Sequence, residues 1–230
     1  MLLIGHRGCS YPGFNQNTIR AFEEVTSQGI KAIEFDVQLS SDDKLVVVHD
    51  LNLEKVSTGK GNVCDTDSAT LRELYAGDQS IKGDRIPFLS EVFDFFSSCS
   101  PEKRPGIHLE LKGSNTGKKA ADLFMDYLTE EKLVLSDLLV SSFNWEELKA
   151  FRQVYPQVKI ALLEGAIRRA ELIKKTGSVA AKYFEKIFSY GNEDYMLLRY
   201  PDLISNLKLV KDVCQEPELQ VILISEIKAC

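Results

Sequence analysis

The sequence predicts an α/β fold of the TIM (β/α)8-barrel type, with a diverged or shortened C-terminal unit. Short apolar runs alternate with segments of helical periodicity along most of the chain, which is typical of a parallel sheet covered by helices. The absence of a glycine-rich dinucleotide turn and of a P-loop sequence favours a barrel over an open, doubly wound sheet. The 230 residues suit one large core, so we expect a single domain over residues 1–230.

The first part of the chain reads as a strand, a helix and two further strands. Residues 1–4 are apolar, and the helical pattern over 15–28 stops at Gly29, a residue type that commonly ends helices. The short connections to the next strand, at 32–37, imply parallel pairing through a right-handed crossover. Polar residues 40–44 then predict a turn before the apolar run 45–48.

Residues 51–85 are rich in Gly, Asp, Ser and Thr, and we interpret them as a long excursion over a site, with one helix near 69–75. The alternation then resumes with a helix at 86–96, a strand at 107–111, a helix at 118–131, a strand at 138–142, a helix at 145–155 and a strand at 158–163. Weaker patterns predict a helix at 166–175, a strand at 186–190, a helix at 201–213 and a strand at 219–225. A complete barrel of about 250 residues would need one more strand and helix after this point.

Composition excludes several classes of protein. The net charge of -6 and the scattered basic residues argue against nucleic-acid binding. No apolar run reaches the roughly 18 residues of a membrane span, and the chain enters a strand directly, so we expect a cytoplasmic protein without a transmembrane segment. The five cysteines form no C-x-x-C pair, which indicates reduced thiols. A sheet edge left open by a shortened barrel predicts a possible homo-oligomer.

Ionisable residues gather at the ends of the predicted strands. His6 follows the first apolar run and His49 ends the run at 45–48. Between them, strand periodicity places Glu34 and Asp36 on one face of the strand at 32–37. The strand at 107–111 repeats the pattern with Glu110, and because a covered parallel strand should be apolar on both faces, these polar residues indicate a function.

These residue types suit the chemistry of a phosphate ester. The carboxylates Glu34, Asp36 and Glu110 are hard oxygen ligands that suit Mg²⁺ or Ca²⁺ rather than zinc. The guanidinium of Arg7 matches phosphate oxygens, and Lys112 offers a point charge. The imidazoles of His6 and His49 titrate near neutrality and can act as general acid and general base. The sequence therefore predicts a metal site, a phosphate-binding pair and an acid-base pair acting on a small-molecule phosphodiester.

The motifs resemble, in order, the signature of the glycerophosphodiester phosphodiesterase family. The matched blocks are His6-Arg7-Gly8, Asn17-Thr18 with Ala21-Phe22, Glu34-x-Asp36-Val37, Asp42-Asp43, His49-Asp50, Ile86-Pro87-x-Leu89 and Leu109-Glu110-Leu111-Lys112. The resemblance implies a TIM barrel that hydrolyses glycerophosphodiesters to glycerol 3-phosphate and an alcohol with a divalent metal. It also implies Glu34, Asp36 and Glu110 as metal ligands, His6 and His49 as the catalytic pair, and Arg7 and Lys112 as phosphate contacts. The usual mechanism of the family passes through a cyclic phosphate.

The sequence departs from the family pattern at two places. Gln16 stands where the family commonly has Glu, and the late Trp-Thr-x-Asn and Thr-Asp-x-Pro strands are absent. Two alternatives therefore stay open: a phospholipase D-like enzyme that attacks lysophospholipid or sphingomyelin, and a non-enzymatic descendant that binds a phosphodiester. His108 shares a face with Glu110, but the family motif does not demand it, so we expect a packed or hydrogen-bonded interior residue there. We expect Asp50 to orient His49 or to cap a loop rather than to contact the substrate.

Overall fold

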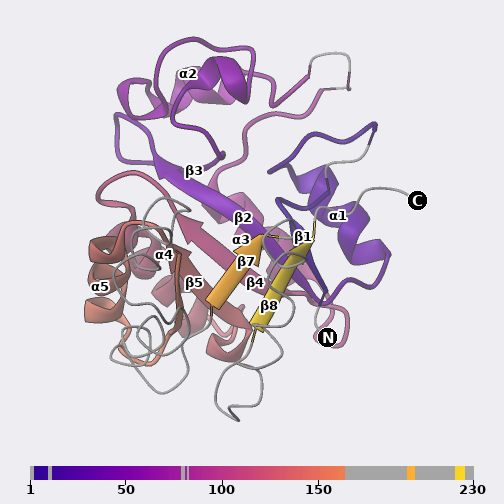
Figure 1. The fold of residues 1–230 in the computed structure, drawn as a ribbon, viewed down its shortest axis with the longest axis vertical. Helices are drawn as coiled ribbons and strands as arrows, with labels where there is room; N and C mark the ends of the chain where they lie inside the picture. Colours follow the sequence, from indigo (N-terminus) through magenta and orange to yellow (C-terminus); the bar gives the residue numbers. More distant parts are fainter. Residues whose placement is uncertain are drawn as a thin grey trace, which may run out of the picture.

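The fold is built on a largely parallel β-sheet with helices packed beside it (Figure 1). The computed structural model describes residues 3–9, 12–78, 81, 83–163, 196–199 and 221–225. Seven parallel strands follow the order β6-β5-β4-β2-β1-β8-β7. They are β1 (Leu3–His6), β2 (Ala32–Leu39), β4 (Gly106–Leu111), β5 (Leu138–Ser142), β6 (Lys159–Leu162), β7 (Met196–Arg199) and β8 (Val221–Ser225). The two ends of this order, β6 and β7, approach within 8 Å between Cα atoms, although no register pairs them within the described ranges.

One strand, β3 (Leu45–Val47), runs antiparallel to β2 and forms a hairpin with it. The helices are α1 (Ile19–Ser27), α2 (Ser68–Glu73), α3 (Leu89–Ser98), α4 (Thr116–Thr129) and α5 (Trp145–Val154). All five lie within or beside the ranges that the sequence predicts. Helix α1 begins later than expected because Thr18 is extended and its hydroxyl caps the helix by accepting the N–H of Ala21 at 3.3 Å.

Alternation along the strands separates an apolar outer face from a partly polar inner face. The outer residues of β2, Ile33, Phe35 and Val37, are fully buried against the helices, and the ring of Phe35 lies 5.5 Å from that of Phe22 on α1. The inner face begins with a small apolar layer, which consists of Ile4, Ala32, Leu139 and Ala161. On β1, β2 and β5 the next inner-face residues are polar, namely His6, Glu34 and Ser141, and this places the predicted site toward the carboxyl ends of these strands.

The excursion at 51–85 is folded around its own small core. It contains the 3₁₀ helices η1 (Leu53–Lys55) and η2 (Val63–Asp65) as well as α2, which confirms the predicted helix near 69–75. Its buried apolar residues form a cluster with the end of the hairpin, namely Val46, Val48, Leu53, Val63, Leu71, Ala76 and Ile86. Figure 1 shows α2 and its flanking loops beyond β3, away from the helices that cover the sheet.

The described residues beyond β6 form one strand that the sequence did not predict, β7, and one that it did, β8. The predicted helices at 166–175 and 201–213 and the predicted strand at 186–190 lie outside the described residues. Within the described ranges, no helix combines the length and the apolar composition that crossing a membrane requires. Cys9, Cys64 and Cys99 are free thiols, as expected.

Candidate active site

Three buried carboxylates form the centre of the candidate site. Glu34 and Asp36 lie on the inner face of β2, and Glu110 lies on β4 directly opposite Asp36. The three residues are 1%, 0% and 8% exposed, and each offers an oxygen within 4.8 Å of the others. The strand register thus brings together the carboxylates that the sequence singles out as metal ligands.

Two cations compensate part of this negative charge. The ammonium of Lys112 lies 2.7 Å from Glu110 Oε1 and 3.3 Å from Asp36 Oδ1. The Nε atom of Arg7 lies 3.3 Å from Asp36 Oδ2. Burial opposes the ionisation of Asp36, but Lys112, His49 and Arg7 together lower the pKa of this carboxyl below its ordinary value. Asp36 is therefore the carboxylate that the protein itself holds in the charged form.

Glu34 and Glu110 have the opposite electrostatic balance. Burial raises the pKa of both carboxyls, and for each of them the charge of Asp36 raises it further. Glu34 accepts the backbone N–H of Arg7 at 3.0 Å through Oε2, whereas its buried Oε1 has no hydrogen-bond partner. A buried carboxylate oxygen without a donor is costly.

The donor set fits a hard divalent cation. Three carboxylates face two cationic side chains, which leaves a local excess of one negative charge that a divalent ion would reverse. The unpaired Oε1 of Glu34 would supply a free ligand atom for such an ion. Oxygen ligands in this number suit Mg²⁺ or Ca²⁺, so the residues present fit the cofactor that the sequence predicts.

The backbone conformation of Arg7 and Gly8 directs the loop after β1 toward the carboxylates. Arg7 has a φ of 56°, which directs its N–H to Glu34. Gly8 has a φ of 80°, and a Cβ atom there would lie 2.9 Å from side-chain atoms of Ala21 and Phe22. Only glycine combines that conformation with such a close approach to α1.

Asn17 is a site residue whose role the sequence did not reveal. Its Nδ2 donates to Asp36 Oδ2 at 2.9 Å, and its Oδ1 accepts the N–H of Asp36 at 3.3 Å. Asn17 also has a positive φ, 58°, a conformation that Asn tolerates better than most residues. Its place in the Asn17-Thr18 motif, followed by a helix, was the available signal.

The hairpin explains how His49 reaches the carboxylates. Because β3 runs antiparallel to β2, the chain returns alongside Asp36, whose carbonyl accepts the N–H of Val48 at 3.0 Å. The buried Gln38 fixes the exit of the hairpin by donating to the carbonyls of residues 48, 49 and 50 at 3.0 to 3.1 Å. No pattern in the sequence indicated this role for Gln38.

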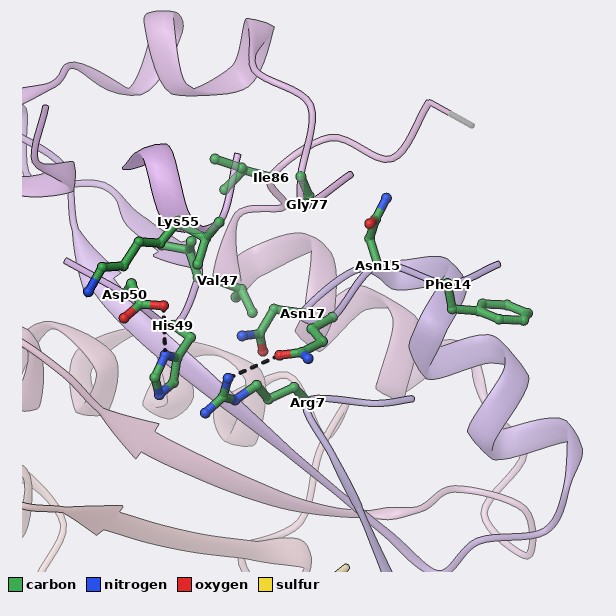
Figure 2. A pocket seen from close by; sticks show the side chains of 14 residues that line it. Arg7, Phe14, Asn15, Asn17, Val47, His49, Asp50, Lys55, Gly77 and Ile86 are labelled. Carbon is green, nitrogen blue, oxygen red and sulfur yellow. Dashed lines mark hydrogen bonds and ion pairs between the residues drawn. The ribbon is translucent and has the colours of Figure 1, made fainter. Parts of the chain in front are cut away.

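His49 is oriented by the residue that follows it. Its Nδ1 lies 3.2 Å from Asp50 Oδ2, as Figure 2 shows, so its Nε2 remains for the site. Burial lowers the pKa of His49 below its usual value, with Asp36 and Asp50 acting in the opposite direction. The second predicted catalytic histidine, His6, lies with its Nε2 3.8 Å from Glu34 Oε2.

His108 belongs to the interior, as expected. It is 2% exposed, shares a row with Glu34 and has its Nε2 2.8 Å from the hydroxyl of Ser141. Burial lowers the pKa of His108 to about 3, so the ring is neutral at physiological pH. We assign it no role in proton transfer.

A pocket of about 360 Å³ opens beside Arg7 and His49 (Figure 2). The loop before α1 forms one wall, the excursion forms another, and the lining residues are Arg7, Phe14, Asn15, Gln16, Asn17, Val47, Val48, His49, Asp50, Lys55, Val56, Ala76, Gly77 and Ile86.

A latch joins the two walls of this pocket. Arg20 donates to both oxygens of Asp84 at 3.0 and 2.8 Å. Asn15 donates to Asp84 Oδ2 and to the carbonyl of Asp78, and it accepts the N–H of Asp78 at 3.0 Å. The returning limb of the excursion is therefore fastened to the loop that precedes α1.

Comparisons with known proteins identify the family of this chain. A model of the glycerophosphoryl diester phosphodiesterase family matches residues 6–213. The chain is 33% identical over 170 residues to a glycerophosphodiester phosphodiesterase of Caldanaerobacter subterraneus subsp. tengcongensis, covering 70% of this chain and 66% of that protein. It is 32% identical over 183 residues to one of Bacillus altitudinis, covering 76% and 71%. The chain thus spans about two thirds of the first relative's length.

Solved structures match the fold. A phosphodiesterase of Oleispira antarctica, in complex with the product sn-glycerol-3-phosphate, has a TM-score of 0.75 at 24% identity over 98% of this chain and 84% of its own. A structure from Silicibacter pomeroyi has a TM-score of 0.74 at 20% identity over 98% and 82%. These neighbours are TIM barrels, which confirms the predicted fold class.

Proposed function

Because the chain belongs to the glycerophosphoryl diester phosphodiesterase family, we propose that it hydrolyses glycerophosphodiesters to glycerol 3-phosphate and an alcohol, with Mg²⁺ or Ca²⁺ as cofactor. We also propose that residues 1–230 form one catalytic domain. The named activities of the two relatives and the product bound to the Oleispira enzyme support this reaction. The observation that carries the proposal is the carboxylate cluster, within 4.8 Å, paired with two cations and flanked by two histidines.

Glu34, Asp36 and Glu110 would hold the cation. A bound divalent ion supplies electrophilic stabilisation of the negative charge that develops on the phosphate oxygens. The carboxylates are buried and fixed by the strand register, by Asn17 and by the N–H of Arg7, so little rearrangement opposes binding. Such preorganisation is a large part of the catalytic effect of a polar site.

Arg7 and Lys112 would bind the phosphate. Both side chains are 15% exposed, and both already lie against the carboxylate cluster, so an entering phosphate meets two fixed cations. The planar guanidinium can donate two parallel hydrogen bonds, whereas the ammonium acts as a point charge. Their charges orient the diester before any bond breaks, which lowers the entropic cost of the reaction.

His6 and His49 would carry the protons. One imidazole takes the proton of the attacking hydroxyl, and the other gives a proton to the oxygen of the departing alcohol. In the route that the family resemblance implies, the glycerol 2-hydroxyl attacks phosphorus, the bond to the alcohol breaks, and a cyclic phosphate forms. Water then opens this ring with the proton transfers reversed, so each histidine serves in both senses.

The test is release of glycerol 3-phosphate from a panel of glycerophosphodiesters with Mg²⁺, with Ca²⁺ and with EDTA. We expect turnover that EDTA abolishes, and a loss of about 10²- to 10⁴-fold in kcat for His6→Ala and His49→Ala. Glu34→Ala should lose both turnover and calorimetrically measured metal binding. Glu23→Ala, an exposed position on α1, is the matched control and should retain both.

Each failure has a separate meaning. Turnover that persists in EDTA would refute the cofactor. A folded, metal-loaded protein that hydrolyses no water-soluble diester would refute the proposed substrate class. In that case, hydrolysis of lysophospholipid or sphingomyelin would indicate the phospholipase D-like alternative, and binding of a diester without turnover would indicate a non-enzymatic descendant.

A further inference from the structure

The pocket beside Arg7 and His49 is lined by charged and hydrogen-bonding groups that suit some alcohol substituents of a diester, its head groups, better than others. It shares these two residues with the candidate catalytic site, so a diester whose phosphate lies at Arg7 extends one substituent into it. The following inference rests on the proposed function, and it concerns the alcohol that the enzyme releases.

The lining cannot form an aromatic cage for a quaternary ammonium group. Recognition of choline-like cations depends on several aromatic faces around the charge. Among the residues that line this pocket, Phe14 is the only Phe, Tyr or Trp, and the guanidinium of Arg20 already lies 4.7 Å from the centroid of its ring. Figure 2 shows the ring of Phe14 directed away from His49.

The charges of the lining also disfavour a cationic head group. Arg7 and Lys55 are positive, whereas Asp50 is the single carboxylate of the lining and already contacts His49 at 3.2 Å. Figure 2 shows Lys55 reaching along the pocket from the excursion, with its ammonium on the side of Asp50. An ammonium substituent would therefore meet two like charges in the same pocket.

Hydroxyl groups fit the hydrogen-bonding capacity that remains. Gln16 accepts a hydrogen bond from Arg7 Nη1 at 3.0 Å through its oxygen, and its amide nitrogen has no partner among the described residues. Lys55 and this amide can donate to hydroxyl oxygens, while the Asp50 carboxylate can accept from hydroxyl protons. By contrast, Val47, Val48 and Ile86 are at most 3% exposed, so they offer little apolar surface to an acyl chain.

The volume admits a large polyol as well as a small one. A pocket of about 360 Å³ lies in the range of about 300 to 1,000 Å³ that is usual for small-molecule sites. Inositol brings more free hydroxyl groups into a diester than glycerol does, so it can use more of the donors and acceptors of this lining.

We propose that this pocket binds a polyhydroxylated head group of the size of inositol, and that Lys55 and Gln16 are binding residues for it. The preferred substrate is then a glycerophosphodiester of a polyol, and diesters of choline and ethanolamine are poorer substrates.

The test compares kcat/KM for glycerophosphoinositol, glycerophosphoglycerol, glycerophosphoethanolamine and glycerophosphocholine. The wild-type protein should prefer the inositol diester. Lys55→Met should lower the ratio of inositol to choline activity by about tenfold, the effect of losing one hydrogen bond to a charged group. Gln16→Ala should lower the same ratio, whereas Lys60→Met, an exposed lysine of the same excursion that does not line the pocket, should leave it unchanged.

Two results would overturn the inference. One is a preference for the choline diester, and the other is an equal effect of Lys55→Met on all four substrates, which would place the common glycerol group in the pocket. Calorimetric titration of the inositol and choline diesters into the His6→Ala protein provides a readout without turnover. If the wild-type protein hydrolyses none of the four, the proposed function fails, and this titration still decides which head group the pocket binds.

Discussion

The carboxylate cluster predicts that removing one negative charge stabilises the protein in the absence of metal. We consider Glu34→Gln, which keeps the shape of the side chain and an oxygen that can accept the N–H of Arg7. The amide NH₂ replaces the unpaired Oε1 and can donate to the neighbouring carboxylates. The same substitution removes a ligand of the proposed metal site, so it should affect stability in opposite directions with and without metal.

The magnitude follows from the distances in the cluster. Two unit charges about 4.8 Å apart repel by about 3 kcal/mol at an effective dielectric constant of about 20, and the oxygens of the three carboxylates lie within 4.8 Å of one another. Arg7 offsets part of this repulsion. We therefore expect Glu34→Gln to raise the free energy of unfolding in EDTA by about 1 to 3 kcal/mol at neutral pH.

The effect has a defined pH dependence. Burial first, and then Asp36 and Glu110, raise the pKa of Glu34 above 4.5 in the folded protein. A carboxyl with a raised folded pKa stabilises the folded state only while it is protonated, and this stability is lost as the pH rises from about 4.5 through the folded pKa. The advantage of Glu34→Gln should therefore vanish at acidic pH and grow toward neutrality.

Urea unfolding in EDTA, and in saturating Mg²⁺ or Ca²⁺, measures both effects. A metal at about 100 times its Kd should stabilise the wild-type protein by about 2.7 kcal/mol and the variant by much less. Glu147→Gln is the matched control, since this buried glutamate accepts hydrogen bonds from the N–H groups of Asn115 and Gly117. Its loss of charge should destabilise the protein by about 1 to 2 kcal/mol. Destabilisation of metal-free Glu34→Gln, or an undiminished metal response, would refute the reasoning.

Three further predictions concern neighbouring residues. Asp50→Asn should weaken the orientation of His49 and lower kcat. Because Asp50 raises the pKa of the His49 imidazole, the acidic limb of the pH profile of kcat/KM should shift to lower pH in this variant. An unshifted profile would count against this role of Asp50. Gly117→Ala should destabilise the protein by about 1 to 3 kcal/mol in urea unfolding, since its Cβ would overlap the carbonyl oxygen of Glu147; a neutral result would show that α4 and α5 separate easily. Asn17→Ala removes both hydrogen bonds between Asn17 and Asp36. It should lower the free energy of unfolding by about 1 to 3 kcal/mol and weaken metal binding measured by calorimetry. An unchanged metal affinity would limit the role of Asn17 to stability.

The sequence predicted the carboxylate cluster because period-two alternation fixes which side chains share a face of a strand. This rule alone predicts that Glu34 and Asp36 share a face. Glu110 lies beside them because β2 and β4 pair with Asp36 opposite Glu110. His49 was predicted for an incomplete reason. Its place after an apolar run predicted only the exit of a strand, and it is the antiparallel pairing of β3 with β2 that brings it back toward Asp36.

What the sequence could not predict depends on contacts distant along the chain. The roles of Asn17 and Gln38 arise from side-chain hydrogen bonds to segments 10 to 19 residues away, which no local pattern encodes. The strand β7, which was not predicted, pairs with β8, whose partner residues lie 25 positions further along the chain (Met196 with Val221). The latch between Arg20 and Asp84 joins residues 64 positions apart.

The latch has a consequence for how such an enzyme can change. The residues that we propose as catalytic come from the sheet, from the loop after β1 and from the β2–β3 hairpin, whereas Lys55 and one pocket wall come from the excursion. Because Arg20 and Asn15 hold this module through Asp84 and the backbone of Asp78, an exchange of its inner residues can leave the anchor intact. Part of the proposed selectivity is thus encoded in a stretch of the chain separate from the proposed reaction centre, and grafting residues 51–77 from a relative should change the preference for the alcohol without rebuilding that centre.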